Sequence, residues 1–173
     1  GQHLPLTQAP IRFASWMGGD RDGNPNVTHA VTQEVLLLSR WQAADLYWRD
    51  IDALRGELSM EDCSPALRAM VGEQCREPYR ELLRTVRDRL AATRDWLNAR
   101  LRGELWDDSQ TYQHSTQLLQ PLLLCYESLI ACNMQDIAHD ELANIIRRVA
   151  CFGLQLLKLD IRQESTRHSD TLN

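Results

Sequence analysis

Apolar residues recur every three or four positions through most of this chain, and that spacing limits its fold more than any other feature. One stripe consists of Val31, Val35, Leu38, Trp41, Trp48, Ile51, Leu54 and Leu58. A second consists of Leu82, Leu83, Val86, Leu90, Leu97 and Leu101. Residues with this spacing share one face of an α-helix, so each stripe predicts an amphipathic helix. The chain is therefore predicted to be mainly α, a helical bundle over residues 27–153.

Capping residues and helix breakers predict where the helices begin and end. Asn26 or Thr28 is the expected N-cap of the first helix, and Ser64 followed by Pro65 opens the second. Gly103 is expected to end the third helix. The predicted helices run from the first cap to about residue 58, and over about 65–75, 78–102, 118–133 and 140–152, with a polar loop at 104–114.

Two segments that alternate in strand fashion flank this helical region. They are residues 10–17, which include Ile11 and Phe13, and residues 156–163, where Leu157, Leu159 and Ile161 alternate with Lys158, Asp160 and Arg162. A period of two is typical of a strand, and we expect the apolar face of the second strand to pack on a core. Since two strands cannot form a sheet core alone, the bundle is predicted to be an insert between two strands of a larger α/β (TIM-like) barrel, with residues 164–173 opening the next element.

A polar cluster follows each predicted strand. Residues 18–26 are almost all loop formers, and residues 162–168 are all charged or polar. In α/β barrels functional residues lie where strands end and loops begin, so both clusters are candidate site residues. A buried Arg162 held by Asp160 and Glu164 would offer a guanidinium fork to a phosphate or carboxylate. Two structural alternatives stay open, an Asx turn that caps the first helix and an exposed edge strand.

Composition argues against several classes of function. The chain has 19 basic and 24 acidic side chains and a net charge of −5, which argues against nucleic-acid binding. It has no run of about 18 apolar residues, so a membrane span is not expected. Its five cysteines form no CxxC pair and fit neither a zinc site nor a disulfide framework. We expect them to be buried thiols in a cytoplasmic protein.

No metal site is expected within the chain. The alternation of Asp20, Asp22 and Asn24 resembles the start of a calcium-binding EF-hand loop. However, Pro25 stands where that loop requires glycine, and Val31 stands where glutamate must chelate. The five histidines lack ligand spacing and are expected at the surface. The sequence therefore gives no support to a calcium-responsive module.

Charged residues line the outer face of the third predicted helix. They are Arg80, Glu81, Arg84, Arg87, Asp88 and Arg94. The simplest expectation is a solvated surface. If this face bound a partner instead, the chain would be a stand-alone helical protein-interaction module, which is the alternative function.

Two long motifs resemble a known enzyme family. Residues 13–28, Phe-Ala-Ser-Trp-Met-Gly-Gly-Asp-Arg-Asp-Gly-Asn-Pro-Asn-Val-Thr, resemble one signature of phosphoenolpyruvate carboxylase. Residues 159–168, Leu-Asp-Ile-Arg-Gln-Glu-Ser-Thr-Arg-His, resemble another, in the family's order and at about its separation. Residues 36–41 and 147–153 also resemble the bacterial branch, so the resemblance covers nearly the whole chain.

The resemblance implies a cytosolic lyase that carboxylates phosphoenolpyruvate with bicarbonate to oxaloacetate and phosphate, using Mg²⁺ or Mn²⁺. Such an enzyme fixes carbon dioxide for the tricarboxylic acid cycle, is allosteric, and is a homotetramer. By the same resemblance, Arg162 binds the substrate's phosphate or carboxylate, and Trp16 forms an aromatic wall beside the bicarbonate or CO₂ pocket. The residues that shape the site are then Gly18, Gly19, Asp20, Arg21 and Asp22.

The family's other catalytic parts are missing from this sequence. They are the histidine of a Thr-Ala-His-Pro-Thr motif, the glycine- and arginine-rich mobile loop, the acidic metal ligands and the catalytic lysine. We therefore expect an internal piece of a longer enzyme. By itself this piece should hold no catalytic residue and no metal, and should be inactive and unregulated.

Overall fold

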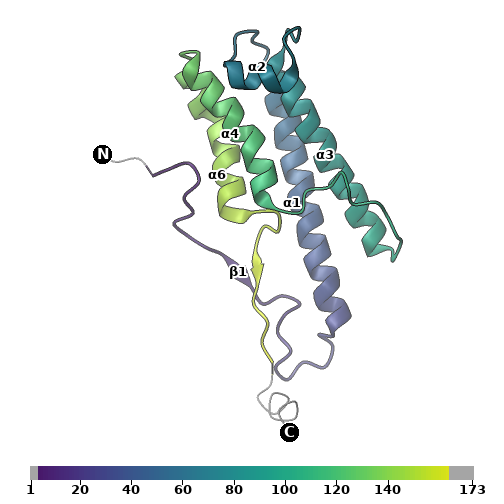
Figure 1. Cartoon of the computed structure of the whole chain (residues 1–173). Coiled ribbons are helices and arrows are strands. Elements are labelled where there is room, and N and C mark those ends of the chain that lie inside the picture. Colours follow the sequence, from purple (N-terminus) through teal and green to yellow (C-terminus); the bar gives the residue numbers. More distant parts are fainter. Residues whose placement is uncertain (1–3, 164–173) are drawn as a thin grey trace.

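Helices make up most of the described chain, which is residues 4–163 of a computed structural model (Figure 1). They are α1 (His29–Glu57), α2 (Pro65–Val71), α3 (Pro78–Leu101), α4 (Ser115–Ala131), α5 (Gln135–Ile137), the π-helical turn η1 (Ala138–Leu142) and α6 (Ala143–Phe152). Two short strands, β1 (Ala14–Ser15) and β2 (Lys158–Leu159), lie beside the first half of α1, beyond the ends of α4 and α6. The predicted mainly α class is confirmed for these residues.

The predicted caps begin the first two helices. Thr28 is the N-cap of α1, and its Oγ1 accepts a hydrogen bond from the N–H of Val31 at 3.4 Å. Ser64 is the N-cap of α2, and its Oγ accepts from the N–H of Leu67 at 3.3 Å. These bonds satisfy donors that the first turn of a helix leaves unpaired. Local sequence signals therefore placed the start of α2, and they limited the start of α1 to two candidates, of which Thr28 is the N-cap.

Three helix ends differ from the prediction. α2 stops at Val71 because Gly72 leaves the helix with φ 98°. α4 begins three residues before the predicted Leu118, since the Gln117 side chain accepts from the backbone N–H groups that precede the helix. The last helical segment begins at α5 rather than at Asp140, where the backbone departs from helical geometry within η1.

One apolar core holds the helices together. α1 packs along α3, and α2, α4 and α6 complete the core. Its largest fully buried side chains are Tyr79, Tyr112, Ile51, Leu58, Leu67, Leu83, Leu90, Leu97, Leu118, Leu122, Leu129 and Leu142. Burial of each such side chain contributes about 1.5–3 kcal/mol. The α3 stripe is buried apart from Leu101, so its spacing marks the packed face of that helix. The α1 stripe is buried only from Ile51 onward, and Leu38 is 47% exposed, so the prediction is wrong for the first part of α1.

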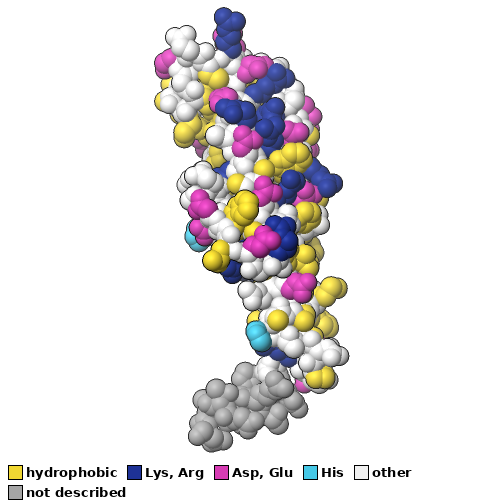
Figure 2. All heavy atoms as spheres, turned by 90° about the vertical axis from the view of Figure 1, so that its right-hand side faces the viewer, with side chains coloured by type: hydrophobic (Ala, Val, Ile, Leu, Met, Phe, Trp, Pro, Cys, Tyr) yellow, Lys and Arg dark blue, Asp and Glu magenta, His cyan; other side chains and the backbone are white. Residues whose placement is uncertain are grey.

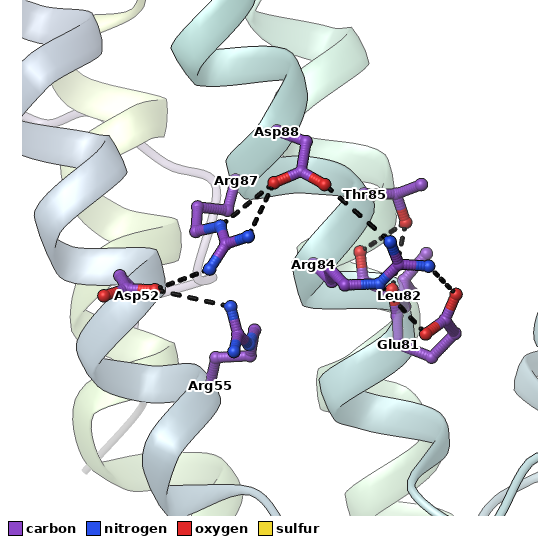
Figure 3. Close-up of polar contacts among 8 residues, drawn as sticks. All are labelled: Asp52, Arg55, Glu81, Leu82, Arg84, Thr85, Arg87 and Asp88. Carbon is purple, nitrogen blue, oxygen red and sulfur yellow. Dashed lines mark hydrogen bonds and ion pairs between the residues drawn. The ribbon is translucent and has the colours of Figure 1, made fainter.

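The charged face of α3 is only partly a solvated surface, which corrects the prediction. Figure 2 shows acidic and basic side chains interspersed over this side of the bundle. Arg84 pairs with Glu81 on the same helix, at 2.5 Å. Arg87, in contrast, lies 3.1 Å from the carboxylate of Asp52 on α1 (Figure 3). Part of this face therefore joins the two long helices.

Arg94 makes the most buried of these links, because its partner Asp45 is only 5% exposed. Asp45 Oδ1 accepts from Arg94 Nη1 at 2.7 Å, and Asp45 Oδ2 lies 2.7 Å from Arg49 Nη2. The Arg94 guanidinium also lies over the ring of Trp48, 4.9 Å from its centroid. Arg94, predicted to be solvated, instead fastens α3 to α1.

We expect Asp45→Asn to lower the free energy of unfolding of this chain by about 2 kcal/mol, because a half-buried guanidinium loses its counter-charge. Urea denaturation followed by circular dichroism measures the change. Asp88→Asn is the matched control, since Asp88 is exposed and its ion pairs with Arg84 and Arg87 should each contribute less than about 0.5 kcal/mol. Equal losses for the two variants would contradict a special role for the Asp45–Arg94 pair.

The two strands pair in parallel, with Ala14 opposite Lys158 and Ser15 opposite Leu159. Each is shorter than the predicted strands at 10–17 and 156–163. The expected packing of the apolar face of β2 on a core is wrong for the described chain: Leu157 is 42% exposed and Ile161 is 61% exposed. In the described chain, each strand pairs only with the other, and no further layer of structure covers these side chains. The predicted element at residues 164–173 lies outside the described residues.

The cysteines are less buried than predicted. Cys125 is fully buried in α4, and burial raises the pKa of its thiol to about 12. Cys63, Cys75, Cys132 and Cys151 are partly exposed instead. Within residues 4–163, none of the helices combines the length and apolar character needed to cross a membrane.

Candidate functional site

The parallel pairing of β1 with β2 joins the two polar clusters that lie far apart in the sequence. Beyond the strands, the N–H of Arg162 donates to the carbonyl of Gly19 at 2.9 Å. The N–H of Arg21 in turn donates to the carbonyl of Arg162 at 3.0 Å. Asp20 therefore stands opposite Arg162 as an isolated parallel bridge. Five of the predicted site residues, Gly18–Asp22, thus lie in one loop that holds the backbone of Arg162.

The Arg162 guanidinium lies over the indole ring of Trp16, 5.0 Å from its centroid. Both side chains are exposed, Trp16 to 58%. Arg162 is therefore not the buried residue predicted, and no ion pair joins it to Asp160 among the described residues. The other expected partner, Glu164, lies outside that part of the chain. Stacking on an aromatic face orients the fork while its N–H donors stay available to an anion.

Gly18 and Gly19 allow the loop to approach its neighbours closely. Gly18 has φ 79°, and a Cβ there would lie 2.6 Å from Cγ2 of Val35 on α1. A Cβ on Gly19 would lie 2.3 Å from the carbonyl oxygen of Asp160. Both distances are shorter than van der Waals contact, so any side chain would push the loop away from α1 or from the second polar cluster.

The side chains of Asp20 and Asn24 stabilise the turns of the loop. Asp20 Oδ1 accepts from the N–H of Asp22 at 3.3 Å, and Asn24 Oδ1 accepts from the N–H of Asn26 at 3.1 Å. These are Asx turns, so that structural alternative is present in the molecule together with the contact to Arg162. Asp22 is exposed and Asp20 is half-buried. Their geometry is that of loop-shaping residues.

Thr32, in the first turns of α1, also contacts the site, and the sequence analysis missed it. Its Oγ1 donates to the carbonyl of Gly18 at 2.7 Å and accepts from Arg21 Nη2 at 3.0 Å. The side chain is buried, with the residue 6% exposed. Nothing in the sequence distinguishes this threonine from a surface threonine, because its partners lie in a preceding loop whose path the sequence does not specify.

Two cavities adjoin this region without including the Trp16–Arg162 pair. One of about 480 Å³ lies between the loop and the start of α1, with Arg21, Asn24 and His29 among its lining residues. Another of about 560 Å³ lies beside the strands, with Arg12, His114 and Lys158 among its lining residues. The Arg162 fork therefore stands on an open surface, where it can bind a phosphate or carboxylate presented from outside.

The residues present do not fit a divalent cation. Among residues 4–163, no three His, Cys, Asp or Glu side chains gather as metal ligands do. His29, His114 and His139 are exposed, and His3 and His168 lie outside the described residues. In the loop, Asp20 is already engaged in a turn. The described residues alone therefore do not make up a metal site.

Comparison with known proteins extends over the whole chain. The profile of the phosphoenolpyruvate carboxylase family matches residues 1–173. The phosphoenolpyruvate carboxylase of Acinetobacter baylyi is 63% identical over 171 residues, 99% of this chain and 19% of that protein. The enzyme of the same name from Pseudomonas aeruginosa is 57% identical over 173 residues, 100% of this chain and 20% of that protein. The chain thus spans about a fifth of the length of these curated relatives.

Proposed function

Because this chain belongs to the phosphoenolpyruvate carboxylase family, we propose that it forms part of an enzyme that carboxylates phosphoenolpyruvate. The second substrate is bicarbonate, and the products are oxaloacetate and phosphate. The observation that carries the proposal is the junction of the two polar clusters, where the loop of residues 18–22 holds Arg162 above Trp16. The enzyme supplies oxaloacetate to the tricarboxylic acid cycle.

Arg162 supplies positive charge and paired N–H donors to the phosphate or carboxylate of phosphoenolpyruvate. Transfer of the phosphoryl group and formation of an enolate both redistribute negative charge, and a fixed cationic fork stabilises that charge more than mobile water does. Trp16 fixes the fork from one face and forms an apolar wall beside the bicarbonate or CO₂ pocket. Such a wall keeps water from the reactive intermediates.

The two strands are part of a larger parallel barrel in this proposal. The supporting observations are the parallel pairing itself and the exposure of Leu157 and Ile161. Parallel strands normally have both faces covered by other elements, and two strands alone leave these apolar side chains in water. The helices from α1 to α6 then form the insert between two neighbouring strands.

The remaining parts of the site come from outside this chain. The described residues offer no metal site, so we assign the Mg²⁺ or Mn²⁺ of the family, and the catalytic histidine and lysine, to other parts of a cytoplasmic, allosteric homotetramer. The chain alone is then inactive. The interaction-module alternative is not favoured, because the family match spans the whole chain and several arginines of α3 bind within the bundle.

An assay of the full-length enzyme that contains this chain tests the proposal. We expect bicarbonate-dependent formation of oxaloacetate, and we expect Trp16→Ala to lower kcat/KM about tenfold, because Arg162 loses the surface on which it lies. Trp16→Phe keeps an aromatic face and should retain most of the activity. Trp106→Ala, at an exposed position in the loop before α4, is the control. A folded wild-type enzyme with no carboxylation activity would overturn the proposal.

A further inference from the structure

Thr32 links the start of α1 to Gly18 and Arg21, at the two ends of the loop segment that pairs with Arg162. Its single hydroxyl holds the carbonyl of Gly18 and the guanidinium of Arg21, at 2.7 Å and 3.0 Å. The Arg162 N–H donates to the carbonyl of Gly19, the residue after Gly18, and the Arg162 carbonyl accepts from the backbone N–H of Arg21. One side chain of α1 thus fixes the segment that pairs with Arg162.

The Thr32 hydroxyl lies near two carbonyl acceptors, and the carbonyl in the loop is the nearer of the two. Thr32 Oγ1 lies 3.1 Å from the carbonyl of Thr28, one helical turn earlier, and 2.7 Å from the carbonyl of Gly18. A threonine within a helix commonly donates to the preceding turn, so the nearer loop carbonyl is a tertiary contact that helix geometry does not require. Because Thr32 is buried, water cannot readily replace the hydroxyl in this contact.

We propose that Thr32 is a positioning residue for substrate binding, acting through Gly18 and Arg21 on the place and orientation of Arg162. This inference rests on the proposed function, since it requires that Arg162 binds substrate. Thr32 itself does not touch substrate. Without its hydroxyl, the Gly18 carbonyl and the Arg21 guanidinium each lose a partner, and the loop that receives Arg162 is held less firmly.

The test compares Thr32→Val and Thr32→Ser in the full-length enzyme. Valine keeps the shape of threonine but removes the hydroxyl, and we expect kcat/KM for phosphoenolpyruvate to fall roughly tenfold, mainly through a higher KM. Serine keeps the hydroxyl and should retain activity within about twofold of wild type. Thr85→Val is the matched control: Thr85 makes similar backbone contacts within α3 but lies on the outer face (Figure 3).

A second comparison separates positioning from general stability. In an Arg162→Ala background, Thr32→Val should lower kcat/KM by less than about a further twofold. The reason is that Thr32 acts by positioning the Arg162 side chain, which this background lacks. Losses that multiply would overturn the proposal, as would equal losses for valine and serine. A Thr32→Val enzyme that does not fold would also overturn it, because the hydroxyl would then serve the fold.

Failure of this inference can be told apart from failure of the proposed function. A folded wild-type enzyme without carboxylation activity overturns the proposed function. If the wild type is active and Arg162→Ala alone leaves it fully active, Arg162 does not bind substrate, and the positioning role of Thr32 is wrong while the proposed function stands. If Arg162→Ala abolishes activity while Thr32→Val behaves as wild type, only the positioning role is wrong. Circular dichroism and the oligomeric state of each variant are measured alongside the kinetics.

Discussion

Arg162→Ala in the full-length enzyme should lower kcat/KM for phosphoenolpyruvate by about 10²–10³-fold, the loss typical of removing one fixed donor to developing negative charge. The backbone of Arg162 pairs with Gly19 and Arg21, and alanine keeps these bonds. The substitution therefore removes the guanidinium without removing the pairing of the two clusters. Steady-state kinetics with saturating bicarbonate measures the change.

Arg162→Lys separates charge from geometry. Lysine keeps the positive charge but lacks the planar fork, so we expect activity between that of wild type and that of the alanine variant. Arg147→Ala, an exposed position on α6, is the control for loss of one arginine. If Arg162→Ala were as active as Arg147→Ala, Arg162 would have only a structural role, although the family assignment would stand.

Gly19→Ala should reduce the activity of the full-length enzyme by about a hundredfold, because a shift of about 1 Å in a binding group has effects of that size. The added Cβ would lie 2.3 Å from the carbonyl oxygen of Asp160, so the loop and the second cluster must separate. Separation breaks the bond from the Arg162 N–H to the Gly19 carbonyl. We expect the far-ultraviolet circular dichroism to change little, since the helices do not depend on this contact.

Gly56→Ala is the matched control for this substitution. Gly56 lies in α1, and a Cβ there would have no heavy atom within 4 Å. Alanine at this position should leave kcat/KM unchanged and stabilise the fold by about 0.5–1 kcal/mol, because glycine is the poorer helix former. A Gly19→Ala enzyme with wild-type activity would show that the close approach to Asp160 is not needed for function.

The helical part of the fold could be predicted from the sequence because its signals are local. Apolar spacing marked the packed face of α3 and of the last turns of α1. Ser64 is the predicted N-cap of α2, and Thr28 is one of the two residues predicted to cap α1. The strands were predicted less well, since alternation gives a strand's period but not its neighbours. Leu157 and Ile161 alternate as strand residues do, yet the described chain does not cover them.

The sequence also does not predict which charged side chains form buried contacts. Arg94 and Arg84 are both arginines on α3, and the sequence placed both in solvent. Arg94 instead lies against Asp45, a residue 49 positions away in the sequence. Whether a charged side chain meets water or a buried partner depends on how two helices are rotated about their axes, which apolar spacing specifies only approximately.

By itself, the sequence determined the class of the fold, the positions of the caps and the identity of two polar motifs, because each depends on residues close together in the chain. The tertiary structure alone decided that these motifs meet, that Arg162 lies on Trp16, and that Thr32 of α1 holds the loop between them. Those contacts join residues that are distant in sequence, and they exist only because strand pairing and helix packing place the backbone within hydrogen-bonding distance.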